Sequence, residues 1–113
     1  MKNKGRTPLA LAAVALATVG LTGCGGIEGK IGNYDRVPVW ENADPKGQQP
    51  IARLTILTPV TVECHEPGKV DAQGMGYGGS YKVSYDGGSG YIDDSTSIMS
   101  DGGEVSPERV PEC

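Results

Sequence analysis

One short stretch of the chain decides the fold class: residues 79–92 read GSYKVSYDGGSGYI. In its first half, Tyr and Val alternate with polar side chains, and a period of two is typical of a strand with one buried face. Asp86 and the glycines after it tolerate positive φ and favour a tight turn. Because the extended pattern resumes at residues 90–92, the stretch predicts a β-hairpin.

Other β-branched runs precede this hairpin. Residues 36–41 (RVPVWE), 51–57 (IARLTIL) and 60–64 (VTVEC) each predict a strand, whereas the polar, Pro- and Gly-containing residues 42–50 and 65–79 predict loops. The 113-residue chain contains 18 Gly, 8 Pro and no Phe, a composition that favours a turn-rich β protein over a helical one. This length leaves room for one compact domain and excludes a large catalytic domain.

Residues 79–92 resemble the closing hairpin of bacterial Src-homology-3-like (SH3-like) domains. The family pattern runs Gly-Trp-Tyr-Lys-Val, a turn of Asp-Gly type, then Gly-Trp-Val. Residues 51–54 and 60–62 fall where that family has its two central strands, and the likeness covers residues 34–99. The resemblance implies an all-β fold, a small SH3-like barrel of about five strands.

The sequence departs from the family pattern at two aromatic positions. Ser80 and Tyr91 stand where the pattern has tryptophan, and aromatic side chains commonly form the recognition surface of such barrels. Trp40, Tyr77 and Tyr91 are therefore the candidate binding surface. A barrel this small also needs aromatic side chains in its core. The sequence therefore leaves open whether these three residues pack in the core or form a binding surface.

The start of the chain predicts a lipoprotein signal peptide over residues 1–23. Three basic side chains stand within the first six residues, and residues 9–21 form an apolar run. As a helix this run spans about 20 Å, less than a hydrocarbon core of about 30 Å. Residues 21–24 (LTGC) resemble a lipobox, cleaved between Gly23 and Cys24 with a lipid on the cysteine. The alternative is an ordinary secretory leader in which Cys24 is incidental.

Four segments follow from these patterns. The signal peptide is followed by the lipidated Cys24 with a flexible, glycine-rich tether to residue 33, the SH3-like domain over residues 34–99, and a polar C-terminal tail over residues 100–113. Two or three acyl chains anchor a protein durably, at about 0.8 kcal/mol for each buried methylene. The predicted location is the extracytoplasmic face of a cell membrane.

Cysteine parity supports lipidation. An exported protein with three cysteines has one that cannot pair within the chain. If the Cys24 thiol carries the lipid, Cys64 and Cys113 are left to form a disulfide. Such a bond draws the tail back across the domain, where it could cover an edge strand. The alternative is a free, buried Cys64 and a frayed Cys113.

Charge limits the partners. Three of the ten basic residues leave with the leader, so seven basic and fourteen acidic residues remain and the mature net charge is −7. Nucleic acid repels such a surface, and bulk electrostatics does not draw it to anionic lipid. The predicted contact with a membrane is made through the lipid anchor.

No pattern predicts catalysis, a metal or a cofactor. Cys64 and His65 are neighbours on a predicted strand, so their side chains point to opposite faces, and no second histidine completes a zinc site. Residues 74–79 satisfy GxGxxG but lack the strand and helix that a dinucleotide site needs. Asp93 and Asp94 are expected on a solvated acidic surface.

The predicted function is a membrane-anchored lipoprotein with a small, non-enzymatic interaction module at the cell envelope, and the SH3-like resemblance implies contact with peptidoglycan or other cell-wall material, a peptide or an envelope protein. The alternative is a structural or blocking accessory lipoprotein, such as a phage-type exclusion protein, without a small ligand. Both rest on the anchor and the β domain, and on the lack of a catalytic pattern.

Overall fold

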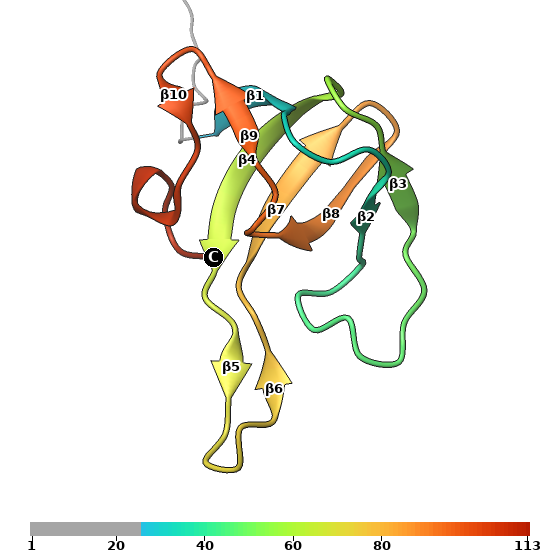
Figure 1. Cartoon of the computed structure of the whole chain (residues 1–113), viewed down its shortest axis with the longest axis vertical. Helices are drawn as coiled ribbons and strands as arrows, with labels where there is room; N and C mark the ends of the chain where they lie inside the picture. Colours follow the sequence, from blue (N-terminus) through green and yellow to red (C-terminus); the bar gives the residue numbers. More distant parts are fainter. Residues whose placement is uncertain (1–25) are drawn as a thin grey trace, which may run out of the picture.

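The computed structural model describes residues 26–113, so the predicted leader and Cys24 lie outside the described residues. Figure 1 shows an open β-sheet with two small hairpins attached. In chain order the elements are β1 (Ile27–Ile31), β2 (Val37–Val39), β3 (Ala52–Leu54), β4 (Pro59–Glu66), β5 (Lys69–Val70), β6 (Gly76–Tyr77), β7 (Ser80–Tyr85), β8 (Gly88–Asp93), β9 (Ile98–Ser100), β10 (Gly103–Glu104) and a 3₁₀ helix (Pro107–Arg109).

The main sheet has the strand order β10-β9-β1-β4-β7-β8, with antiparallel pairing throughout. The predicted all-β class is confirmed. The closed barrel of about five strands is not: among residues 26–113 the main sheet has six strands and stays open. The β2–β3 hairpin meets the β8 edge through one residue pair, Trp40 with Tyr91, which is too little to continue the ladder.

The hairpin predicted over residues 79–92 is confirmed as β7 and β8. Its register runs from Ser80 opposite Asp93 to Tyr85 opposite Gly88, and Asp86 and Gly87 form the two-residue turn. Gly87 has a φ of 114°, which a side chain would disfavour. The alternation predicted from the sequence therefore corresponds to one face that is buried in the core.

Strand β1 corrects the prediction of a flexible tether over residues 24–33. It pairs with β4 on one side and β9 on the other, and so lies inside the sheet. A Cβ on Gly29 would come within 2.7 Å of the Met99 carbonyl oxygen and 2.9 Å of Ile98 Cγ2. Glycine is needed here for close packing. Because Gly29 stands between Ile27 and Ile31, the sequence lacks the alternation of apolar and polar side chains that would have predicted a strand. The sheet also extends beyond residues 34–99 at both ends.

The core lies between the inner face of the main sheet and the β2–β3 hairpin. Nearly every buried side chain is aliphatic, and Tyr81, only 1% exposed, is the largest. The β4–β7 ladder shifts register next to Glu63, which re-aims the end of β4. The core residues are Ile31, Val37, Val39, Leu54, Val60, Val62, Tyr81, Val83, Ile92, Ile98, Val105 and Val110.

A long hairpin leaves the sheet at the end of β4. The chain continues from β4 into β5, turns, and returns through β6 into β7, so that β5 and β6 protrude from the body (Figure 1). The sequence predicted only a loop over residues 65–79. Lys69 pairs with Tyr77 and Val70 with Gly76, where a Cβ on Gly76 would collide with the Lys69 carbonyl group. The glycines taken as loop signals allow this close pairing.

Candidate ligand groove and its support

A groove of about 490 Å³ lies between the loop after β2 and the base of the protruding hairpin. Trp40 stands at one wall and Tyr77 at the other, so the structure brings two of the three predicted aromatic residues together. Both are half-buried. The remaining lining residues are Ala43, Asp44, Pro45, Lys46, Met75, Gly76, Gly78, Gly79, Ser80 and Asp93.

Tyr91, the third predicted residue, is not among those that line the groove. It forms a bridge with Trp40 instead, in which each backbone N–H donates to the other carbonyl oxygen at 2.8 Å. Their neighbours Val39 and Ile92 are fully buried, so Trp40 and Tyr91 occupy the opposite, outward positions of their strands. Tyr91 therefore holds the Trp40 backbone in place, and Trp40 itself is not a core residue.

Ser80 lines the groove at the start of β7. The residue is 5% exposed, and its hydroxyl has no hydrogen-bond partner among the described residues. Buried polar atoms in native proteins nearly always have a partner, and leaving one unpaired costs about 1–3 kcal/mol. Sequence reasoning noted Ser80 only as a replacement for tryptophan and missed this unsatisfied hydroxyl.

The rim opposite Tyr77 is held by bonds within its own loop. Asp44 Oδ1 accepts from the Lys46 N–H at 3.0 Å, the Asp44 carbonyl accepts from the Gln48 side chain, and the Pro45 carbonyl accepts from the Gln48 N–H at 3.0 Å. Such local bonds order a loop without help from the core. Residues 44–48 of the rim are consequently ordered by bonds of their own.

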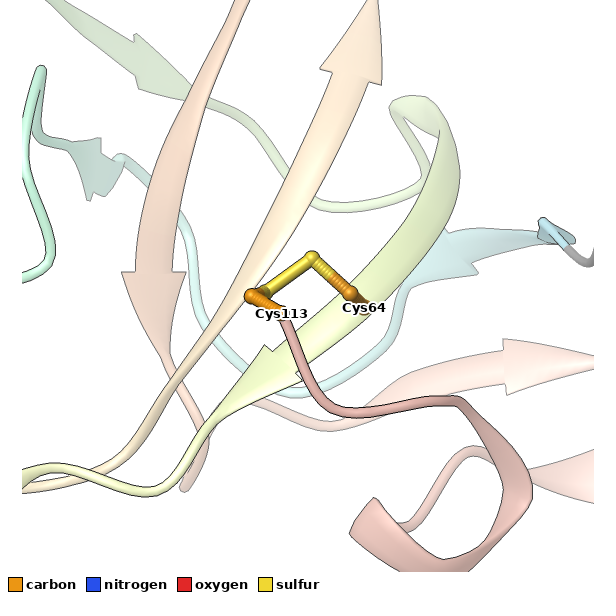
Figure 2. Close-up of a disulfide and its surroundings, with 2 residues drawn as sticks. All are labelled: Cys64 and Cys113. Carbon is orange, nitrogen blue, oxygen red and sulfur yellow. A yellow bond between two sulfur atoms is a disulfide. The ribbon is translucent and has the colours of Figure 1, made fainter.

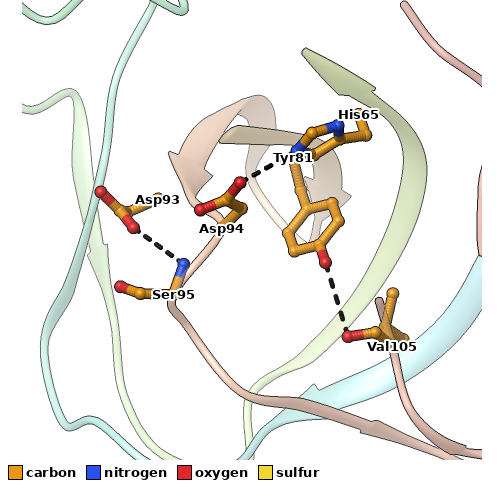
Figure 3. Close-up of polar contacts among 6 residues, drawn as sticks. All are labelled: His65, Tyr81, Asp93, Asp94, Ser95 and Val105. Atoms are coloured by element: carbon orange, nitrogen blue, oxygen red, sulfur yellow. Dashed lines mark hydrogen bonds and ion pairs between the residues drawn. The ribbon is translucent and has the colours of Figure 1, made fainter. Parts of the chain in front are cut away.

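A polar cluster supports the other wall (Figure 3). His65 Nε2 lies 3.0 Å from Asp94 Oδ2, and the His65 ring packs edge-on to Tyr81 with centroids 5.4 Å apart. The Tyr81 hydroxyl donates a long hydrogen bond of 3.5 Å to the Val105 carbonyl. Burial raises the pKa of Tyr81 above its usual range, and the negative charge of Asp94 adds to the shift.

Gly79 makes room for this cluster. A Cβ there would collide with the Asp94 carboxylate and come within 3.0 Å of His65 Nε2. Asp94 was expected on the solvated surface, but it is half-buried and paired with the only histidine of the chain. Asp93 is exposed, as expected, and its Oδ1 accepts from the Ser95 N–H at 2.8 Å. Tertiary contact alone distinguishes the two neighbours.

The predicted disulfide is present: Cys64 and Cys113 are bonded, with their Cα atoms 5.0 Å apart (Figure 2). The tail docks in parallel beside the end of β4, where the His65 N–H donates to Pro111 at 2.8 Å and the Cys113 N–H donates to His65 at 2.9 Å. β1 begins at Ile27, opposite Val62, so its pairing does not reach the last residues of β4. The tail pairs there instead, on the same side of β4 as β1, and covers the edge of β4 that β1 leaves free. His65 faces Tyr81 across the ladder while Cys64 carries the disulfide, so the two residues do not form a reactive pair.

A second hollow, of about 620 Å³, lies over β1, β9 and the turn between β7 and β8. Its charged residues are mostly acidic (Glu28, Asp86 and Asp101), and Tyr85 is its one aromatic residue. Because Tyr85 packs against the core, this hollow lacks a free aromatic platform. The groove between Trp40 and Tyr77 is the better candidate site.

Two further findings concern the part of the chain that the structure describes. No helix in it is long and apolar enough to cross a membrane. Nor do three or more His, Cys, Asp or Glu side chains gather there in a way that could hold a metal ion.

Comparisons with protein-family models, with curated proteins and with solved structures found no match to the chain. The SH3-like resemblance therefore stays a prediction. Gly23 and Cys24 lie outside the described residues, so lipidation stays a prediction too.

Proposed function

We propose that this chain is an extracytoplasmic lipoprotein, anchored to a membrane through Cys24, whose β domain binds cell-wall material or an envelope protein in the groove between Trp40 and Tyr77. The observation that carries the proposal is the groove itself, which is lined by the half-buried aromatic side chains of Trp40 and Tyr77. The two aromatic side chains supply apolar contact area, and polar groups of the rim are available to orient a ligand.

The overall architecture belongs to the same proposal. We infer a distant SH3-like relation from residues 79–92, in which the β7–β8 hairpin corresponds to the family's closing hairpin. The domain is non-catalytic in this proposal, and its aromatic groove is a recognition surface. Trp40 and Tyr77 stack on or pack against the ligand, and the charged side chains among the lining residues (Asp44, Lys46 and Asp93) orient it.

Binding is tested by titrating the purified chain with sonicated cell wall and, separately, with detergent-solubilised envelope proteins. We expect retention on one of them, and Trp40→Ala and Tyr77→Ala each to weaken it at least tenfold, about 1.4 kcal/mol. Ile51→Ala is the matched control, since it removes an exposed apolar side chain outside the groove. No retention of the wild-type chain on either material contradicts the proposal.

Crosslinking in cells separates this function from a structural or blocking role. Wall binding predicts adducts with wall material or none, whereas a single dominant protein adduct that survives Trp40→Ala favours an accessory lipoprotein without a small ligand. Mass measurement of the mature N-terminus tests the anchor: a lipid on Cys24 is expected, and an unmodified, uncut start contradicts it.

A further inference from the structure

The turn between β3 and β4 exposes two large aliphatic side chains at its tip. Thr58 N–H donates to the Thr55 carbonyl at 3.1 Å, which closes a four-residue turn with Ile56 and Leu57 at its centre. Ile56 is 48% exposed and Leu57 is 66% exposed. Turn centres usually hold Gly, Asn, Asp or Pro, so an Ile-Leu pair here is unusual.

Leu57 is also strained. Its φ is 70°, a left-handed conformation that costs a residue with a Cβ about 1–2 kcal/mol. Among residues 26–113 only Arg36 shares a positive φ without being glycine, and it follows Asp35, whose carboxylate accepts from the Ile56 N–H at 3.4 Å. The two strained loops are therefore in contact, and Leu57, which stays 66% exposed, gains little burial within the domain in return for its strain.

This turn contacts the C-terminal end of β1, at the opposite end of that strand from Ile27, where β1 begins. Leu57 N–H donates to the Ile31 carbonyl at 2.8 Å, at the far end of β1, and Figure 1 shows β1 and the β3–β4 turn opposite the protruding β5–β6 hairpin. Only Gly25 and Gly26 separate Cys24 from β1. At about 3.6 Å per residue, Ile27 is held within roughly 11 Å of the lipidated residue, and the Ile31 end of β1, which the turn contacts, lies roughly 14 Å further along the strand.

We propose that Ile56 and Leu57 insert into the interface of the same bilayer that holds the lipid on Cys24. This inference rests on the proposed anchor and adds an orientation: the domain lies on the membrane through this turn, and the groove faces away. Tyr34, 50% exposed in the neighbouring loop, has the amphipathic character found at headgroup level.

Basic residues near the turn fit a membrane contact better than the acidic surface elsewhere does. Lys30 precedes Ile31, Arg36 follows Asp35, and Arg53 lies on β3 two residues before Thr55. These are three of the seven basic residues left after cleavage of the leader. Long basic side chains extend to headgroups while aliphatic neighbours enter the acyl boundary. The acyl chains of Cys24 supply the affinity, and the turn sets the orientation.

The test uses the full chain, processed in bacteria and reconstituted into phosphatidylcholine vesicles with or without a spin-labelled phosphatidylcholine. A polarity-sensitive fluorophore is attached at Leu57→Cys or, as the matched control, at Val70→Cys, a position 69% exposed on the protruding hairpin. We expect spin-labelled lipid to quench the fluorophore at position 57 several-fold more than at position 70. Equal quenching at the two positions overturns the inference.

Vesicle flotation separates this inference from the proposed anchor. Flotation of the wild-type chain without quenching at position 57 overturns the orientation alone, whereas failure of the wild-type chain to float overturns both. Energy transfer between labelled copies, without lipid quenching, assigns the turn to a contact between two chains and also overturns it.

A second pair of variants separates docking from folding. Leu57→Gly relieves the positive φ and should raise the midpoint of thermal unfolding. Leu57→Asp, with the fluorophore at Ile56→Cys, should keep flotation and lose most of the quenching. Unchanged quenching in Leu57→Asp contradicts insertion of the turn.

Discussion

The two halves of one long hairpin have opposite environments. In the half formed by β4 and β7, Val62 and Val83 are fully buried, whereas in the half formed by β5 and β6, Val70 is 69% exposed. Valine side chains on paired strands are thus buried in the core in one half and exposed to solvent in the other. The distal half has no core to hold it, so the disulfide and the His65–Asp94 pair at the junction determine where it points, and with it the Tyr77 wall of the groove.

Removing the junction's disulfide should have the largest effect. The bond closes a loop with a sequence separation of 49 residues, for which chain entropy predicts a loss of about 4 kcal/mol in the free energy of unfolding. Urea denaturation of the Cys64→Ala/Cys113→Ala variant measures it, and the reduced wild-type chain should behave alike. A loss under about 1 kcal/mol would show that the junction is held without the disulfide.

The same substitution in the two halves tests the comparison directly. Val83→Ala removes fully buried methyl groups and should lower the free energy of unfolding by about 2 kcal/mol. Val70→Ala removes exposed ones and should change it by less than about 0.5 kcal/mol. Equal losses would mean that the distal half is buried against something in solution.

Two neighbouring glycines test the junction. Gly79→Ala should split the His65–Asp94 pair and cost about 1 kcal/mol, because the added Cβ collides with Asp94. Gly78→Ala is the matched control, since its Cβ meets nothing within 4 Å. Urea denaturation measures both variants, and the cost of Gly79→Ala should shrink when Asp94 is also alanine. A cost that persists there would trace to the backbone and not to the pair.

The smallest effect concerns pH. The pKa of Tyr81 is raised above its ordinary value of about 10, mainly by burial, so the folded state binds the proton more tightly than the unfolded state. Its contribution to stability is complete below pH 10 and is lost as the pH rises further. In Tyr81→Phe, the decline in stability from about pH 10 upward should be shallower than in the wild-type chain, as measured by urea denaturation. An identical slope would assign the alkaline loss to other groups.

The sequence by itself determined the all-β class and the β7–β8 hairpin with its Asp86-Gly87 turn, and it favoured the Cys64–Cys113 pairing over a free Cys64. These follow from local rules: a period of two, turn residues that accept positive φ, and cysteine parity. It also named Trp40, Tyr77 and Tyr91 as the candidate binding surface, but left open whether these side chains belong to the core instead.

Only the tertiary structure decided the rest. Gly29 belongs to a strand because Ile98 and Met99 approach it closely, and Asp94 is paired because the fold brings His65 to it across 29 residues. Whether the sheet closes into a barrel also depended on a contact between segments far apart in the sequence. The β2–β3 hairpin meets β8 only through the pair Trp40 and Tyr91, so the sheet stays open. The type of a residue and its neighbours in the sequence indicate its local conformational preference. Which side chains pack or pair with it depends on the distant segment that the fold places beside it, and no local pattern contains that information.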